Sequence, residues 1–361
     1  MKTRSSNSSN SDNNSDVFFC TKTLCSYFPL TALIPMSIVY IILWMVGVTG
    51  NIITILIIRK YKDMRTTTNF YLSSMAVSDM IILFCLPFDL YRLWKAKPWI
   101  FGEFMCKFFY FIGEGCTYST ILHITALSIE RYLAICFPLK AKVFITKRRV
   151  KAIIFFLWVF ASLSAGPFFF LAGMEAGNFT EPSETSWECN TTQYARESGL
   201  LKILVWMTTI YFFVPMFCLN ILYGFIGRTL WKSKDRIREF DAADIEGRNH
   251  KQAVKIWAVV VLAFVICWLP FHIGRIIFIY ASEQTLSLSQ YFNIVAMLLF
   301  YLSAAINPIL YNLISKKYRA AAYKLLRSDP AGERAYSVTR DDTGGYTDTS
   351  GSIQHDYVTN I

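Results

Sequence analysis

The sequence predicts an all-α membrane protein, a bundle of seven transmembrane helices followed by a short amphipathic cytoplasmic helix. Three observations indicate this fold class. The chain of 361 residues is 54% hydrophobic and only 17% charged, more apolar than a soluble domain of its size. Seven largely apolar runs reach the length of about 20 residues that a hydrocarbon layer of about 30 Å requires. Lys and Arg gather in the segments that follow alternate runs.

The apolar runs set the limits of the helices and of the polar tails. The predicted spans cover 33–58, 70–91, 104–129, 152–173, 201–226, 254–280 and 288–314, and the short helix covers 316–326. Residues 1–29 are expected to be a disordered, glycosylated extracellular tail, 30–327 the membrane domain and 328–361 a disordered cytoplasmic tail. We expect the first span to direct its own insertion, because the polar start of the chain has no apolar signal core.

The distribution of positive charge predicts the orientation. The segments 59–69, 140–151, 228–255 and 316–327 hold 23 Lys and Arg, whereas the N-terminal tail and the other loops hold 7. Cytoplasmic loops retain positive charge, so the chain is expected to be a multi-pass plasma-membrane protein with its N-terminus outside and its C-terminus inside. The net charge of +11 is mostly this topology signal beside membrane lipid, and it does not indicate nucleic-acid binding.

The predicted outer side holds glycosylation motifs and cysteines, which are typical of segments exposed to an oxidising, secretory compartment. Four N-x-Ser/Thr triplets, at Asn7, Asn13, Asn178 and Asn190, are candidate glycosylation sites. Cys106 and Cys189 both face this side and are predicted to form a disulfide, which would hold the loop 174–200 over the bundle as a lid. Cys20 and Cys25 form a second bridge or remain two unpaired thiols.

Polar residues inside the spans are candidate functional residues, because each costs at least ~2.5–3.5 kcal/mol to insert at a helix centre. Asn51, Asp79 and Asn307 lie near the midplane, and Pro308 removes a backbone bond next to Asn307, which kinks the seventh span. These side chains are expected to form a polar network across helices. The network either rearranges during function or is static packing.

The third span ends at a second polar group, Glu130 and Arg131. At 1.5 Å per residue, Arg131 lies about 37 Å below Cys106, at the cytoplasmic boundary, and Glu130 is expected to hold it in the resting state. In the sixth span, Trp268 precedes Pro270, and a proline within a helix creates a bend that can open or close. The Trp268 side chain is large enough to couple this bend to whatever packs on its outer side. An ordinary transmembrane kink is the alternative for this proline taken alone.

The outer half of the bundle carries the candidate binding site. Its polar residues are Asp89, Tyr91, Arg92, Glu114, His272 and Arg275, and its aromatic residues are Phe108, Phe109, Tyr118, Phe271 and Tyr301. Glu114 lies about 12 Å below Cys106, at a depth comparable with that of Arg275, so the two can pair. Such a pair in an aromatic cavity suits a peptide ligand. The alternative is a static salt bridge between the third and sixth helices.

One set of motifs per helix resembles the rhodopsin-like G-protein-coupled receptors. The motifs are Asn51, Asp79, Glu130-Arg131-Tyr132, Trp158, Pro215, Cys267-Trp268-Leu269-Pro270 and Asn307-Pro308-Ile309-Leu310-Tyr311, in this order over about 30–327. Within that family, the segments 65–79, 87–94, 113–120, 124–143, 271–277 and 300–319 are similar to the ghrelin and motilin receptor branch. The segments 289–296 and 345–352 and the tail cysteine pair are more similar to its motilin side.

The resemblance implies a receptor for a motilin-like peptide hormone that raises intracellular calcium through the Gq class of G protein and phospholipase C. Glu114 and Arg275 would lie in the peptide pocket. On activation, Arg131 would leave Glu130 and turn toward Tyr223 and Tyr311. Phosphates on the 328–361 tail would recruit an arrestin. A ghrelin-type receptor is the alternative within the branch.

The sequence also departs from the family pattern. Ser303 stands where many members have Asn, which weakens Asp79 as a candidate for a sodium ion, and no cysteine follows Leu326 for palmitoylation. No other metal and no cofactor is expected.

Three other classes of protein fit the sequence less well. A retinal protein needs a lysine in the seventh span, and 288–314 contains none. A transporter is expected to show paired repeats, which we do not find. The four histidines are scattered without ligand spacing, so an enzyme is not expected.

Overall fold

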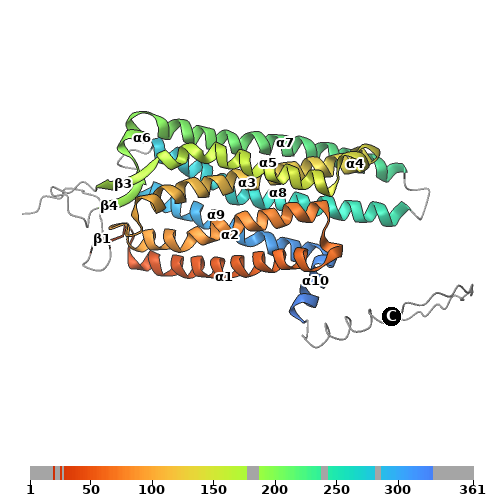
Figure 1. Cartoon of the computed structure of the whole chain (residues 1–361), viewed down its shortest axis with the longest axis horizontal. Helices are drawn as coiled ribbons and strands as arrows, with labels where there is room; N and C mark the ends of the chain where they lie inside the picture. Colours follow the sequence, from red (N-terminus) through yellow and green to blue (C-terminus); the bar gives the residue numbers. More distant parts are fainter. Residues whose placement is uncertain are drawn as a thin grey trace, which may run out of the picture.

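Seven long helices lie side by side along a common axis within the residues that the computed structural model describes (Figure 1). These residues are 19–20, 25–26, 28–176, 187–236, 243–280 and 286–327. The long helices are α1 (Leu30–Lys60), α2 (Thr67–Trp94), α3 (Gly102–Cys136), α5 (Lys147–Ala165), α7 (Leu200–Arg236), α8 (Ala243–Tyr280) and α9 (Leu286–Ile314).

Short elements close the two ends of the bundle. The end that the charge pattern predicts to be cytoplasmic, here called the inner end, holds η1 (Lys62–Met64), α4 (Pro138–Phe144) and α10 (Lys316–Leu326). The opposite, outer end holds β1 (Phe19–Cys20), β2 (Cys25–Ser26), η2 (Gly166–Phe170), β3 (Ala172–Ala176), β4 (Trp187–Thr191) and α6 (Gln193–Glu197). β1 pairs with β2 and β3 with β4, both antiparallel, and Met174 lies opposite Cys189.

Six of the seven predicted spans fall inside one helix each, and the fourth was predicted to end too late. The predicted range 152–173 contains the end of α5, all of η2 and the start of β3. Pro167 explains the early end, because it has no N–H to bond the Leu163 carbonyl. The N–H of Gly166 bonds that carbonyl instead and tightens the helix into a 3-10 turn.

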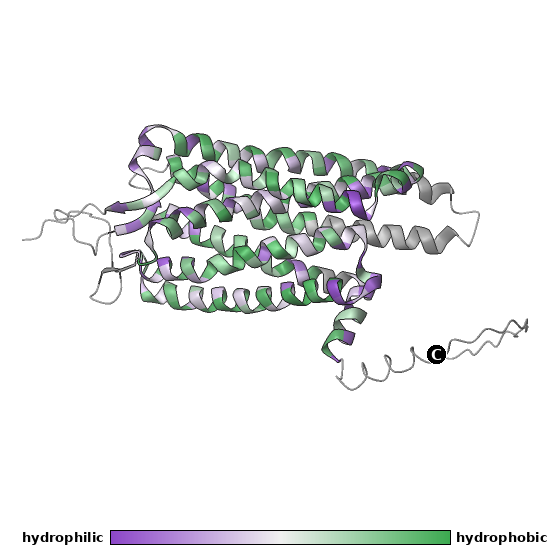
Figure 2. Ribbon diagram, in the orientation of Figure 1, coloured by the Kyte–Doolittle hydropathy of each residue, from purple (hydrophilic) through white to green (hydrophobic). Residues whose placement is uncertain are grey.

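Apolar side chains cover the sides of the bundle. Among the described residues, α1, α2, α5 with η2, α7 and α9 are each long and apolar enough to cross a membrane, and Val261–Ile277 is a shorter apolar part of α8. Large side chains such as Phe156, Leu163 and Phe217 are exposed on these sides. Figure 2 shows hydrophobic residues along the length of the helices and hydrophilic ones concentrated at both ends. This distribution is that of a protein solvated by lipid.

The third helix is an exception, because it lies at the centre of the bundle. α3 contacts α2, α5, α7 and α8. Its buried residues include Glu114, His123 and Glu130. Polar side chains are tolerated in this position because neighbouring helices supply their partners.

Glycine lets three helices approach one another closely. A Cβ atom added at Gly47 would lie 2.7 Å from Leu83 of α2, and one added at Gly50 would lie 2.8 Å from the Pro308 Cβ of α9. The backbone of α1 therefore packs directly against α2 and α9. This contact fixes the helices that carry the midplane polar residues.

The short helix α10 is attached to α1 through a buried tyrosine. Tyr318 is 4% exposed, and its hydroxyl lies 2.5 Å from the Thr54 hydroxyl. Burial raises the pKa of the Tyr318 hydroxyl, and the bond to Thr54 acts in the opposite direction. Ser315 caps the helix by accepting the Tyr318 N–H at 3.2 Å. One face of α10 is thus buried, while Lys317 is exposed on the other.

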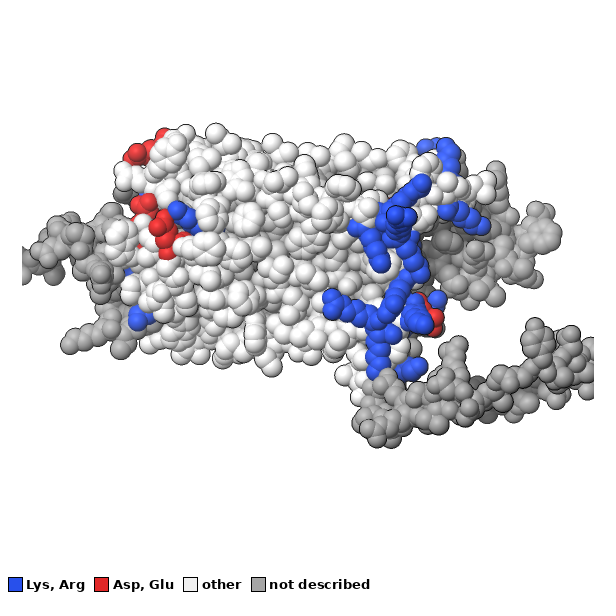
Figure 3. Space-filling view, viewed as in Figure 1, with Lys and Arg blue, Asp and Glu red and all other residues white. Residues whose placement is uncertain are grey.

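Charged residues are segregated to the ends of the molecule. Figure 3 shows Lys and Arg gathered around the inner end, over α4 and α10, and a broad middle zone without charge on the visible face. Most of the visible Asp and Glu lie at the outer end. An uncharged middle zone matches the hydrocarbon layer that the seven helices cross.

Candidate functional site: an outer cavity and an inner polar cluster

A cavity of about 350 Å³ opens between the helices in the outer half of the bundle. Its walls come from α2, α3, α7, α8 and α9, with contributions from η2 and β4. The charged and aromatic residues at the centre of the site are Asp89, Arg92, Glu114, Phe271, Arg275 and Tyr301. A mostly apolar wall with a few converging polar groups is typical of a ligand site.

Glu114 and Arg275 form an ion pair across this cavity, from α3 to α8. The Glu114 side chain is only 4% exposed, whereas that of Arg275 is 26% exposed and reaches the cavity. The guanidinium also lies 4.4 Å from the centre of the Phe271 ring, a cation–π contact. The buried carboxylate is therefore paired with a cation that is open to the cavity.

Two hydroxyls support this ion pair from α7 and α3. The Thr208 hydroxyl lies 3.4 Å from the Glu114 carboxylate and 3.0 Å from the Tyr118 hydroxyl. Arg275 Nη1 lies 3.5 Å from the same Thr208 oxygen. Thr208 and Tyr118 are fully buried. Thr208 therefore links the ion pair directly to α7. The sequence did not predict this link, because a threonine within a span is not a distinctive residue.

A second polar group lies in the same cavity at the outer end of α2. Asp89 accepts a hydrogen bond from the Tyr301 hydroxyl of α9 and lies 3.4 Å from Arg92. Arg92 also donates to the Cys189 carbonyl of β4 at 3.3 Å. The Asp89–Arg92–Tyr301 group thus joins α2, α9 and the outer hairpin.

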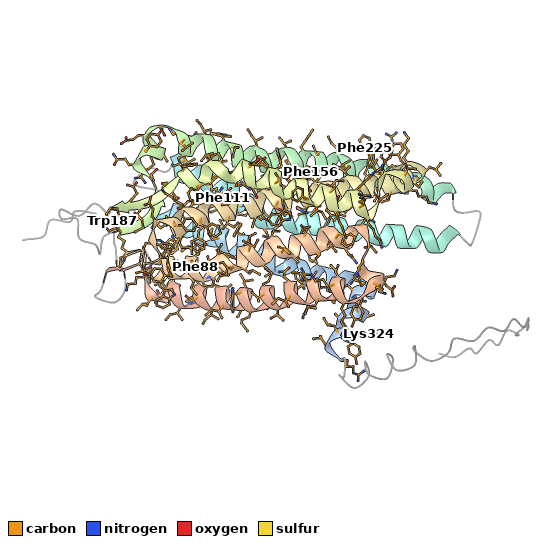
Figure 4. All side chains as sticks on the ribbon, viewed as in Figure 1. Phe88, Phe111, Phe156, Trp187, Phe225 and Lys324 are labelled. Carbon is orange, nitrogen blue, oxygen red and sulfur yellow. A yellow bond between two sulfur atoms is a disulfide. The ribbon has the colours of Figure 1, made fainter. Side chains whose placement is uncertain are left out.

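The β3–β4 hairpin covers the outer end as predicted. Cys106 and Cys189 form a disulfide, with their Cα atoms 5.6 Å apart. The Trp99 N–H donates to the Trp187 carbonyl at 2.8 Å, which joins the α2–α3 loop to β4. Figure 4 labels Trp187 on this hairpin at the outer tip of the bundle and Phe88 further in on α2. The hairpin contributes Asn190 to the cavity wall.

The structure brings most of the residues predicted for the outer site together, but four of them do not line the cavity. These four are Tyr91, Phe108, Tyr118 and His272. The Tyr91 hydroxyl donates instead to the Pro98 carbonyl at 2.8 Å. Tyr118 is fully buried and stacks on Tyr211, with ring centres 4.2 Å apart. His272 is 2% exposed and stacks on Phe212 at 4.5 Å, so its ring is part of the packed core. Sequence spacing gives the depth of a residue but not the side of the helix it occupies.

An aromatic core lies directly beneath the cavity. Phe271 and Phe300 line the cavity, and both contact Trp268, at 6.0 and 5.0 Å between ring centres. Trp268 is 1% exposed and stacks on Phe264. Pro270 lies within α8 beside this core. The cavity floor is thereby packed against the residues next to the proline.

At the inner end, Glu130 and Arg131 pair as expected, at 3.1 Å. The Glu130 carboxylate also accepts the Thr67 hydroxyl at 2.6 Å, and Arg131 donates to the Thr68 hydroxyl. Glu130 is 5% exposed. Both partners of this pair are thus hydrogen-bonded to the start of α2.

The two tyrosines expected near Arg131 are described to different extents. The Tyr223 hydroxyl of α7 lies 3.4 Å from Ser128, one turn above Arg131. The Tyr311 side chain lies outside the described part of the chain. Its role stays a prediction.

The predicted midplane network is present as direct hydrogen bonds. Asn51 donates to the Ala304 and Gly47 carbonyls, both at 2.9 Å, and Asn307 donates to Asp79 at 3.0 Å. The Ser303 hydroxyl bonds the Phe300 carbonyl of its own helix. Within the described residues no group of three His, Cys, Asp or Glu side chains is arranged to hold a metal ion.

A fully buried histidine network was not predicted. His123 Nδ1 donates to the Ser119 carbonyl at 2.6 Å, and Nε2 lies 2.9 Å from the Ser74 hydroxyl. The Trp158 indole donates to Ser74 at 2.8 Å. The network joins α2, α3 and α5 and satisfies each polar atom, which accounts for a histidine and a tryptophan that sequence reasoning left without partners.

The remaining outer predictions lie largely outside the described residues. Asn7, Asn13 and Asn178 are outside them, and Asn190 donates to Glu188 at 3.1 Å. Cys20 and Cys25 face each other in the β1–β2 register, but their side chains are not among those described. The glycosylation sites and the second bridge stay predictions.

The chain is similar to known receptors over most of its length. Residues 50–311 match the family described as 7 transmembrane receptor (rhodopsin family). The chain is 49% identical to the motilin receptor of Homo sapiens over 93% of both sequences. It is 50% identical to growth hormone secretagogue receptor type 1 of Mustela putorius furo over 91% of both. Neuromedin-U receptor 2 of Mus musculus is 34% identical over 80% of this chain and 74% of that receptor.

Proposed function

Since this chain belongs to the rhodopsin family of seven-transmembrane receptors, and within it to the motilin and ghrelin receptor branch, we propose that it binds a peptide hormone of the motilin type. It is a membrane protein of the cell surface and not an enzyme. The ion pair between Glu114 and Arg275 in the outer cavity is the observation that carries this proposal.

The ion pair offers a peptide both signs of charge within one cavity. A cationic amine at the N-terminal part of the peptide competes with Arg275 for the Glu114 carboxylate, and Arg275 is released toward acceptors on the peptide. The aromatic walls at Phe271 and Tyr301 supply contact area. A ligand shifts a conformational equilibrium only by its differential affinity, so these contacts must be stronger in the active state.

Loss of the ion pair acts on α8 and then on the inner end. Once Arg275 leaves Glu114, the outer part of α8 moves relative to α3. The bend at Pro270 converts this movement into an outward swing of the inner part of α8. Arg131 then leaves Glu130 and turns toward Tyr223 and Tyr311. The cleft that opens admits a helix of a G protein of the Gq class, which activates phospholipase C and releases calcium.

Calcium recording in cells tests the proposed pocket. Glu114→Gln and Arg275→Ala should each lower the potency of motilin by about ten-fold or more, since each leaves one buried charged group without its partner. Glu103 and Lys107 form a matched control pair on α3, 2.6 Å apart and outside the cavity. Glu103→Gln and Lys107→Ala should respond like wild type. Unchanged potency in both pocket variants at equal surface expression would show that the pocket is wrong.

A ghrelin-type ligand is the second candidate, because the chain is 50% identical to a growth hormone secretagogue receptor and 49% identical to the motilin receptor. Separate exposure of expressing cells to motilin and to acylated ghrelin distinguishes the two. A response to acylated ghrelin at lower concentration than to motilin would assign the receptor to the second hormone.

The polar tails complete the proposal. We place 1–29 outside the cell and 328–361 inside it, where phosphorylation of the tail recruits an arrestin through the added negative charge. An antibody to an N-terminal tag should stain intact cells.

Truncation after Arg327 should abolish arrestin recruitment and preserve the first calcium response, whereas normal recruitment by the truncated receptor would contradict the role of the tail.

A further inference from the structure

A serine ahead of the first long helix is fully buried at the outer end of α2. Ser26, in β2, is 0% exposed. Its hydroxyl donates to the Leu93 carbonyl at 2.7 Å and accepts the Phe28 N–H at 3.1 Å. Ser26 therefore hydrogen-bonds the end of α2, although it lies 67 residues before Leu93 in the chain.

The end of α2 needs such a partner. The last carbonyls of a helix have no N–H within the helix to bond them. At this end, the Lys95 N–H bonds the Tyr91 carbonyl, and the Ser26 hydroxyl bonds the Leu93 carbonyl. Ser26 thus acts as a cap supplied by a different segment of the chain, and it holds the last turn of α2 in helical form.

Phe28 attaches the same segment to two more helices. The ring is 7% exposed and meets Tyr291 of α9 edge to face, with ring centres 5.3 Å apart. It belongs to a buried cluster with Leu33 of α1 and Ile294 of α9, and Leu93 packs against this cluster. We call Ser26 and Phe28 together the outer strap, because they join the ends of α1, α2 and α9.

The strap lies next to one half of the binding cavity. Arg92 directly precedes Leu93, and Asp89 lies one turn earlier on α2. Tyr301, whose hydroxyl bonds Asp89, is on α9, the helix that Phe28 contacts. Both helices that build the Asp89–Arg92–Tyr301 group are therefore held by the strap.

We propose that Ser26 and Phe28 are positioning residues for peptide binding, which hold the outer turn of α2 so that Asp89, Arg92 and Tyr301 face the ligand together. This inference rests on the proposed function, because the peptide is the ligand whose binding they support. The strap touches no residue of the Glu114–Arg275 pair, so it serves the other half of the cavity.

Calcium responses of strap variants test the inference. Ser26→Ala should lower peptide potency by about five- to ten-fold, and Ser26→Thr, which keeps the hydroxyl, should restore it to within about two-fold of wild type. Phe28→Ala should act in the same direction. Ser198→Ala is the matched control, since Ser198 is an exposed residue at the outer end by α7 whose hydroxyl accepts the Leu200 N–H at 3.4 Å. Surface expression is measured with an N-terminal tag.

Coupling to Arg92 separates positioning from a general loss of stability. In an Arg92→Ala background, Ser26→Ala should change potency by less than about two-fold, because the group it positions is already lost. Potency equal to wild type in Ser26→Ala, or a full additional loss in the Arg92→Ala background, would overturn the inference.

Hydrogen exchange of the purified receptor tests the strap without any peptide. Ser26→Ala should at least double the exchange of amides in the last turn of α2, at 91–94, and leave those at its inner end, at 70–73, unchanged. Equal exchange at 91–94 in both proteins would overturn the inference. A wild-type receptor silent to motilin and to acylated ghrelin would overturn the proposed function instead, and the exchange result would still decide the strap.

Discussion

At the scale of single residues, the two sites depend on carboxylates with few partners. Glu114 has Arg275 and a distant Thr208 hydroxyl, and Glu130 has Arg131 and the Thr67 hydroxyl. Both carboxylates are almost fully buried. A buried charge that loses its partner is costly, and we propose on this ground that each pair acts as a switch.

Glu130→Gln should raise signalling in the absence of hormone. The substitution removes the charge that holds Arg131 at the start of α2, at a cost of about 1 kcal/mol to the resting state, and this shifts the ratio of active to resting receptor by about five-fold. Basal inositol phosphate in cells with equal surface expression measures the effect. Glu103→Gln, in an exposed pair of the same helix, should leave it unchanged, and an unaltered basal level in Glu130→Gln would argue against the resting role of this pair.

At the scale of elements, the helices differ in how closely they pack. α1, α2 and α9 approach one another closely at Gly47 and Gly50, while α7 and α8 extend past the other helices at the inner end, as Figure 1 shows. The close group carries Asn51, Asp79 and Asn307. We propose that this group is the frame against which α8 moves on activation.

Gly50→Ala should lower the thermal stability of the detergent-purified receptor. The new Cβ would lie 2.8 Å from the Cβ of Pro308, a ring that cannot rotate away, so α1 and α9 must separate. Overpacking of this kind costs about 1–3 kcal/mol, equivalent to a Tm lower by about 2–6 °C. Gly224→Ala is the control, because its Cβ would meet no atom within 4 Å. Equal Tm values for the two variants would refute the close contact.

The sequence predicted the elements better than their ends. Hydropathy placed all seven long helices, since each run of apolar residues has one stable structure in lipid. It extended the fourth span past Ala165, because the residues of η2 and the start of β3 are as apolar as a helix and only Gly166-Pro167 marks the break. The hairpin of β3 and β4 was predicted as a lid from one cysteine pair, without its strands.

At the scale of the whole molecule, depth along the bundle axis was predictable and direction around each helix was not. Glu114 and Arg275 were matched by depth and do meet. Tyr118 and His272 were placed in the same binding site but are turned into the core. Contacts between distant segments, such as Ser26 with Leu93 or His123 with Ser74, depend on the packed arrangement and leave no periodic pattern in the sequence.

Saturation binding of labelled motilin to membranes from expressing cells tests the central claim most directly. We expect saturable binding of motilin to the wild-type receptor and to the Glu103→Gln control, and weak competition by acylated ghrelin. The affinity of Glu114→Gln for motilin should be lower by about ten-fold or more, because this variant lacks the carboxylate that receives the peptide amine. The absence of saturable binding to the wild-type receptor, or equal affinity in Glu114→Gln and Glu103→Gln, would contradict the account.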